Sequence, residues 1–213
     1  MIDELTDKEQ VALFKKWWKD YGWALLIAII IGLSLGFGWR YWNQYKLARA
    51  NSASSMYVSL LSLDPEGDKD QVTKIINELD TSYAKTPYDI FAHFYLAQKN
   101  EESKKYDDAI KQLDLALNNP SVANFKDIAQ LRKARIMLEM KKYSDAISSA
   151  DQVVSDAYKP AAQTIVGDVY LAEEKTDEAI AAYTKAEKEY EKLGQMNNLL
   201  AMKLAQFNTP SEK

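Results

Sequence analysis

The 19 residues from Tyr21 to Trp39 contain no charged side chain, and this run constrains the 213-residue chain more than any other feature. As an α-helix it would be roughly 28 Å long at ~1.5 Å per residue, which matches the hydrocarbon thickness of a bilayer. A helix buried in a soluble core rarely stays uncharged over that length. We therefore predict a transmembrane helix over 21–39, with the lipid bilayer as its surroundings.

Aromatic side chains gather at both ends of this run. Indole rings combine an apolar body with one polar edge, so they prefer the headgroup layer of a membrane. Aromatic belts on both sides indicate a spanning segment, and a cleaved signal peptide ending at the Ala-Arg-Ala sequence of 48–50 is the alternative. The predicted membrane-interface anchors are the five tryptophans of the chain: Trp17, Trp18, Trp23, Trp39 and Trp42.

The charges that flank the run favour one orientation. Residues 1–20 contain four lysines, whereas the opposite flank carries Arg40, Lys46 and Arg49. Basic residues near a membrane span are retained in the cytoplasm, and acidic residues contribute little to this preference. By four to three, the sequence predicts a short cytoplasmic segment at 1–20 and a type II topology that places 40–213 outside the cytoplasm.

Two features of the anchor allow alternative interpretations. Gly32 and Gly36 form a GxxxG spacing that lets a partner helix approach closely, so both are candidate helix–helix contacts; the alternative is that glycine is common in membrane helices. Residues 5–18 mix apolar and charged side chains. They form either a short amphipathic helix on the membrane surface or a continuation of the anchor.

The remainder of the chain has helical periodicity and little strand character. A turn-forming cluster at 64–68 separates two expected helices, of which the second covers about 70–85. We assign 40–86 to a helical connector with a first helix pair. The 87–213 segment is assigned to repeats, closed by a capping helix over about 195–207.

Three related segments, YDDAI, YSDAI and TDEAI, indicate the type of repeat. Their alanines, Ala109, Ala146 and Ala179, are 37 and 33 residues apart, which brackets the 34-residue tetratricopeptide period. The predicted fold class is therefore all-α: a single transmembrane helix followed by a tetratricopeptide-like α-solenoid. A non-repetitive helical bundle is the alternative. Lys133 departs from the pattern at an apolar position, and Pro160 is expected near the end of a helix pair.

The composition excludes several kinds of chemistry. Without cysteine the chain has no disulfide, zinc–thiolate site or thiol nucleophile, and a net charge of −4 disfavours nucleic-acid binding. The single histidine, His93, follows Asp89 at helical spacing, but no nucleophile accompanies the pair. The sequence contains no phosphate-binding loop or metal-ligand spacing. We predict a protein that is not an enzyme, with no catalytic residue, metal ligand or cofactor.

A repeat solenoid usually binds its partners along the surface lined by the first helix of each pair. The repeat register predicts a partly apolar groove suited to extended or partly folded polypeptide. The alternative is that several of these side chains belong to the core. The candidate groove residues are Phe91, Phe94, Gln98, Ile128, Leu131, Arg135, Leu138, Asp168 and Leu171.

The full layout resembles a known family. The lead-in Val11-x-x-Phe-Lys-Lys-Trp-Trp-Lys-x-Tyr-Gly22 precedes the anchor, the exit reads Gly38-Trp-Arg-Tyr-Trp-Asn43, and a small-residue stretch at 50–57 precedes the repeats. This arrangement is similar to the YfgM-type family, the ancillary subunit of the bacterial SecYEG translocon. The resemblance covers essentially the whole chain, and its lead-in and exit are the most specific parts.

The resemblance implies a single-pass protein of the bacterial inner membrane with a periplasmic repeat domain. Its implied partners are the SecYEG translocon, a membrane-anchored periplasmic chaperone and client polypeptides that pass between them. Two rival functions remain open. One is a scaffold or assembly factor for another envelope complex, and the other is a regulator of an envelope-stress phosphorelay acting through the N-terminal segment.

Overall fold

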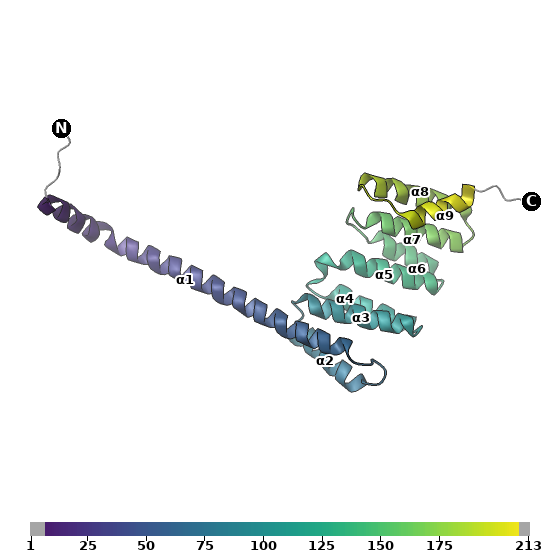
Figure 1. Cartoon of the computed structure of the whole chain (residues 1–213), viewed down its shortest axis with the longest axis horizontal. Helices are drawn as coiled ribbons and strands as arrows, with labels where there is room; N and C mark the ends of the chain where they lie inside the picture. The colour runs from purple at the N-terminus through teal and green to yellow at the C-terminus, as the bar shows by residue number, and fades with distance from the viewer. Residues whose placement is uncertain (1–6, 209–213) are drawn as a thin grey trace, which may run out of the picture. The chain divides into compact units, whose positions relative to one another are not determined.

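A computed structural model describes residues 7–208, which fold as helices without any β-strand in this range (Figure 1). The predicted all-α class is therefore confirmed. The chain divides into two compact units at residues 51 and 52. Residues 1–6 of the predicted cytoplasmic segment and residues 209–213 of the predicted repeat region lie outside the described residues, and the predicted domain limits remain predictions.

The first unit is a single helical rod. Helix α1 begins at Asp7 and ends at Leu61, so its first part belongs to this unit and its last turns to the next. Residues 7–20 continue the helix without interruption, which favours the continuation alternative for the lead-in. Among residues 7–208, α1 is the one helix that is long and apolar enough to cross a membrane. Its large apolar side chains are exposed, as Phe37 at 69% illustrates.

The second unit stacks helices in antiparallel pairs (Figure 1). Helices α3 and α4, α5 and α6, and α7 and α8 pack as pairs, and α4 contacts α5 as α6 contacts α7. This arrangement is the predicted solenoid. The elements are α2 (Lys69–Ser82), α3 (Pro87–Glu102), α4 (Tyr106–Asn118), η1 (Val122–Asn124), α5 (Lys126–Glu139), α6 (Tyr143–Asp151), α7 (Lys159–Ala172), α8 (Thr176–Lys192) and α9 (Asn198–Asn208).

The same backbone turn joins the two helices of each pair. Lys104, Lys141 and Glu174 have φ angles of 57°, 59° and 61°, and each is the second residue after the end of a first helix. The amide of the next residue donates to a carbonyl in the last turn of that helix, as Lys142 N does to Met137 O at 2.8 Å. A left-handed residue in this position ends a helix and satisfies its free carbonyls. The repeats therefore share a turn as well as an alanine.

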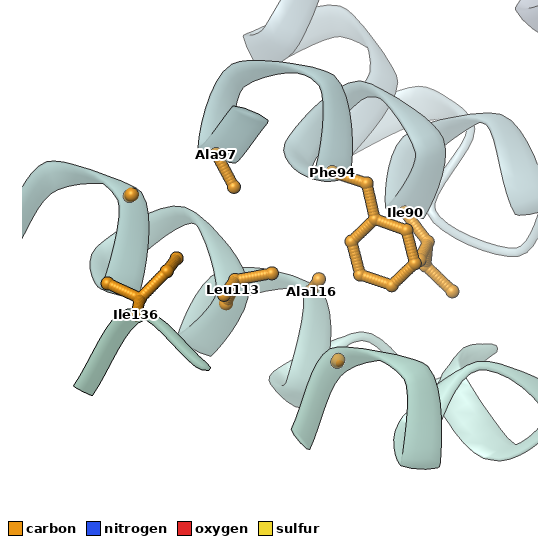
Figure 2. Close-up of a cluster of buried hydrophobic side chains, with 8 residues drawn as sticks. Ile90, Phe94, Ala97, Leu113, Ala116 and Ile136 are labelled. Atoms are coloured by element: carbon orange, nitrogen blue, oxygen red, sulfur yellow. The ribbon is translucent and has the colours of Figure 1, made fainter. Parts of the chain in front are cut away.

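Small residues allow the helices to approach closely. The repeat alanines Ala109, Ala146 and Ala179 are completely buried. In the first pair, Phe94 from α3 points toward α4, where it joins Leu113 in one apolar cluster (Figure 2). The side chains of this cluster also come from α5, so it holds the first pair against the second. The residues labelled in Figure 2 are Ile90, Phe94, Ala97, Leu113, Ala116 and Ile136.

The structure corrects or refines details of the helix pattern. Pro160 lies in the first turn of α7 rather than near the end of a helix pair, where its missing N–H costs nothing. The capping helix α9 begins at Asn198, three residues later than expected, and buries Leu200 against α8. Lys133 is tolerated at its apolar position because its Nζ donates to Asp114 Oδ1 at 2.6 Å, on the neighbouring pair.

Candidate protein-binding site

An open cleft of about 280 Å³ lies in the second unit, between the last turns of α1 and helices α3 and α5. We call it the aromatic cleft, because five of its eight lining residues carry aromatic rings. The residues that line it are Tyr57, Phe91, Phe94, Tyr95, Gln98, Phe125, Ile128 and Arg132.

Contacts between the rings fix the wall of the aromatic cleft. The ring of Phe91 meets that of Phe125 edge to face, with centroids 5.2 Å apart and planes at 81°. The same ring lies 6.1 Å from Tyr57 and 6.0 Å from Tyr88. Edge-to-face pairs align the positive edge of one ring with the negative face of another, which stabilises one arrangement over others. Ring contacts within the fold therefore assemble the apolar wall.

Arg132 supplies the positive charge of the aromatic cleft. Its guanidinium carbon lies 4.9 Å from the centre of the Phe94 ring, and one of its NH groups reaches the Phe94 carbonyl at 3.5 Å. Within the part of the chain that the structure describes, no carboxylate forms an ion pair with Arg132. Burial and the nearby Tyr95 raise the pKa of Tyr57, against the opposing influence of Arg132. The tyrosine therefore stays neutral, and the guanidinium is left available to an acidic group.

The structure brings four of the predicted groove residues together in the aromatic cleft: Phe91, Phe94, Gln98 and Ile128. Of these, Phe94 is also a core residue, since it is only 8% exposed and belongs to the cluster between the first two pairs. The groove and core alternatives are thus not exclusive at this position.

The other five predicted groove residues lie outside the aromatic cleft. Leu131 is buried in the core between the second and third pairs, and Leu138 is half-buried. Arg135 and Leu171 are exposed. Asp168 accepts hydrogen bonds from the Tyr183 hydroxyl and from Lys203, so its carboxylate is occupied within the fold.

Sequence reasoning missed the other half of the aromatic cleft, namely Tyr57, Tyr95, Phe125 and Arg132. Arg132 follows Ile128 by one helical turn, so the helical period could have identified it in place of Leu131. Tyr57 comes from α1, far away in sequence, and no local pattern points to it.

His93 on α3 does not line the aromatic cleft. Its side chain is 98% buried, and its ring contacts Asp80 of α2 and Gln112 of α4. Its Nδ1 lies 2.7 Å from Gln112 Oε1, and its Nε2 lies 3.0 Å from Asp80 Oδ1 and 3.9 Å from Asp89 Oδ1. Burial, followed by the neighbouring Asp80 carboxylate, raises the pKa of Asp89 to about 7. These contacts give the histidine a place in the packing and bring no nucleophile to it.

The residues of α1 that are predicted to contact the membrane or a partner helix lie exposed on its surface. The predicted anchors are exposed, from 44% at Trp17 to 74% at Trp23. A β-carbon added at Gly32 or Gly36 would meet no atom within 4 Å, so the face that carries them is open. These features are compatible with lipid or with a partner helix, and the assignments remain predictions.

The paired helices, the shared left-handed turns and the aromatic cleft define a helical-repeat protein of the tetratricopeptide type. The chain belongs to the tetratricopeptide repeat-like domain family, whose model matches residues 15–209.

The chain is also similar to individual known proteins. A protein of Haemophilus influenzae named Ancillary SecYEG translocon subunit is 25% identical over 172 residues, which cover 81% of this chain and 84% of the relative. A protein of Escherichia coli with the same name is 27% identical over 167 residues, covering 78% and 80%. These relatives confirm the predicted resemblance. A solved structure of MamA from Desulfovibrio magneticus RS-1 is 19% identical, with a TM-score of 0.47 over 66% of this chain and 75% of that one.

Proposed function

We propose that this protein is a non-enzymatic interaction module of the bacterial inner membrane that associates with the Sec translocon and helps to pass translocated polypeptides to periplasmic chaperones. The names of its relatives support the translocon association. The apolar part of α1 supports membrane anchoring. The handoff to chaperones, the translocon contact and the periplasmic location of the repeats are parts of the proposal.

The aromatic cleft is the observation that carries the interaction role. An apolar wall beside an arginine that pairs with no carboxylate of residues 7–208 suits a polypeptide segment with a bulky apolar side chain close to a carboxylate. Aromatic side chains and arginine are the residue types that contribute most to binding at protein interfaces. The cleft is open and small, which favours transient contact with one or two side chains over a stable complex.

The anchor and the charge of the chain support the same role. A membrane-tethered module meets an emerging polypeptide at high effective concentration, so weak contacts suffice. The net charge of −4 opposes nonspecific adhesion to an anionic bilayer surface. The four lysines among residues 1–20 favour a cytoplasmic N-terminus and a periplasmic repeat unit.

Site-specific photo-crosslinking in intact cells tests the proposal. A photoreactive amino acid in place of Gln98, at the exposed rim of the aromatic cleft, should crosslink to translocon subunits or to polypeptides in transit. Charge reversal in Arg132→Glu should reduce these crosslinks severalfold. The matched control is Lys185→Glu, which makes the same charge change on α8, a helix that contributes no residue to the cleft. Equal crosslinking by both variants would contradict the proposal.

Three further measurements separate the rival functions. Protease added to spheroplasts should digest residues 40–213 while a cytoplasmic control survives; protection until lysis would indicate a cytosolic scaffold instead. Deletion of residues 1–20 with the anchor retained should leave client crosslinking intact. A change in envelope-stress signalling alone would favour the regulatory alternative. Capture of subunits from another envelope complex, without the translocon, would favour the scaffold or assembly factor.

A further inference from the structure

Three metal-ligating side chains converge where α2 packs against α3. Asp80 lies in the last turn of α2, and Asp89 and His93 lie in the first two turns of α3. Each offers one ligand atom, and these atoms all lie within 4.8 Å of one another. Asp89 and His93 are 3% and 2% exposed, whereas the side chain of Asp80 is 39% exposed. The cluster is thus buried on two sides and reachable by solvent on the third.

One oxygen of this cluster has no hydrogen-bond partner among residues 7–208. Asp89 Oδ2 accepts a hydrogen bond from the Asn119 amide, but Asp89 Oδ1 is buried with no donor from that part of the chain. This oxygen faces His93 Nε2 at 3.9 Å. A buried carboxylate oxygen without a partner is costly, because it has lost its water and gained nothing in return. A cation held between Asp89 Oδ1 and the other two ligand atoms would supply the partner that this oxygen lacks among the described residues.

The imidazole of His93 is oriented by a hydrogen bond outside the cluster, since Nδ1 lies 2.7 Å from Gln112 Oε1, which can only accept, so Nδ1 donates. Nε2 lies 3.0 Å from Asp80 Oδ1, which can also only accept, so a metal ion bound at Nε2 would take the place of a proton donated to that carboxylate. A histidine oriented in this way, by a hydrogen bond from its second nitrogen, is the usual arrangement of a metal ligand.

We propose that His93 Nε2, Asp80 and Asp89 bind one divalent transition-metal ion, for which Zn²⁺ is the best match. Two carboxylates and one dication balance in charge, and one nitrogen with two oxygens is a ligand set that zinc accepts. In tetrahedral zinc sites with bonds of ~2.0–2.1 Å, neighbouring ligand atoms lie about 3.3 Å apart. The separations of 3.0 and 3.9 Å from Nε2 to the two carboxylates bracket this value.

The proposed ion would tie α2 to α3. These helices are joined by residues 83–86 and otherwise meet through apolar side chains such as Leu79 and Leu96. Water would complete the coordination at the exposed edge beside Asp80. The site is separate from the aromatic cleft, shares no residue with it, and its existence is independent of the proposed function.

Zinc titration of the full-length chain in detergent micelles tests the proposal. The protein carries a tag without histidine and is treated with chelator before Zn²⁺ is added. We expect one Zn²⁺ per chain by isothermal titration calorimetry, with binding weakened at least tenfold in Asp80→Asn. The matched control is Glu78→Gln, which removes the same charge from an exposed position on the same helix and should bind as the parent does. Because Asp80 is partly exposed, its replacement by asparagine should leave the fold intact.

Two readouts identify the ligands more directly. Zn²⁺ should raise the thermal unfolding midpoint of the parent and of Glu78→Gln, but not of Asp80→Asn, because a ligand of the folded state stabilises it. Co²⁺ should give a visible absorption spectrum with the parent that His93→Gln loses. Absence of stoichiometric binding, or equal zinc affinity of Asp80→Asn and the parent, would overturn the proposal.

Discussion

The ring of Tyr183 occupies the space that a side chain at Gly167 would need. A β-carbon built on Gly167 would lie 2.5 Å from both Cδ1 and Cε1 of that ring. Tyr183 is fully buried, and its hydroxyl donates to Asp168 Oδ1 at 2.5 Å, so the ring is held from two sides. Helices α7 and α8 therefore pack at a distance that only glycine permits.

The first prediction concerns this contact. Gly167→Ala should lower the free energy of unfolding by about 1–3 kcal/mol, as overpacking of a core does. The result would be diagnostic, because glycine to alanine in a helix interior ordinarily stabilises by up to ~1 kcal/mol. Urea unfolding followed by circular dichroism measures the change. Combining Gly167→Ala with Tyr183→Leu should cost less than the sum of the two single changes, and additivity would exclude the clash.

The second prediction concerns the shared turns. Lys141 has a φ of 59°, a conformation that glycine adopts without strain, so Lys141→Gly should stabilise by up to about 1 kcal/mol. The matched control is Lys111→Gly in the interior of α4, which should destabilise by ~1 kcal/mol. The thermal unfolding midpoint measures both. Equal destabilisation by the two variants would show that the turn gains nothing from glycine.

The repeats were predictable because their packing is local and periodic. Ala109, Ala146 and Ala179 recur at a spacing that the sequence displays directly, and burial of small side chains at the crossing of two helices explains it. The left-handed turns were not predicted, because Lys104, Lys141 and Glu174 are not the residue types that normally mark this conformation.

The candidate sites were predictable only in part, because tertiary packing assembles them. Phe91 and Ile128 follow from the repeat register, but Tyr57 reaches the aromatic cleft from α1, which no repeat describes. Similarly, the spacing of Asp89 and His93 was visible in the sequence. Asp80 precedes the histidine by 13 residues and joins the pair only because α2 packs on α3.

The third prediction concerns Asp168, which the sequence assigned to the groove. Its carboxylate accepts from Tyr183 and Lys203, so Asp168→Ala should loosen the attachment of α9. We expect amide hydrogen exchange in α9 to accelerate about tenfold, as the loss of a charge-assisted hydrogen bond of ~1.5 kcal/mol implies, with little change in α3.

The control for this experiment is Asp156→Ala. Asp156 pairs with Lys159 at 2.6 Å, but its side chain is 84% exposed, and exposed ion pairs contribute little to stability. Crosslinking from the aromatic cleft should be unchanged in Asp168→Ala. A selective loss of crosslinking without faster exchange in α9 would instead support the original groove assignment.

The fourth prediction concerns the open glycine face of α1. Beyond the adjacent helix backbone, a β-carbon added at Gly36 would meet no described atom within 4 Å, so Gly36→Ile should leave helix content and the unfolding midpoint of the second unit unchanged. If a partner helix packs there, the added bulk should reduce severalfold the crosslinking of a photoreactive residue in the membrane-spanning part of α1 to that helix. The reason is that close approach of two backbones requires small residues. The matched control is Leu35→Ile, at a position that is 69% exposed and one residue away. Undiminished crosslinking in Gly36→Ile would mean that this face meets lipid, and that the glycines serve no helix–helix contact.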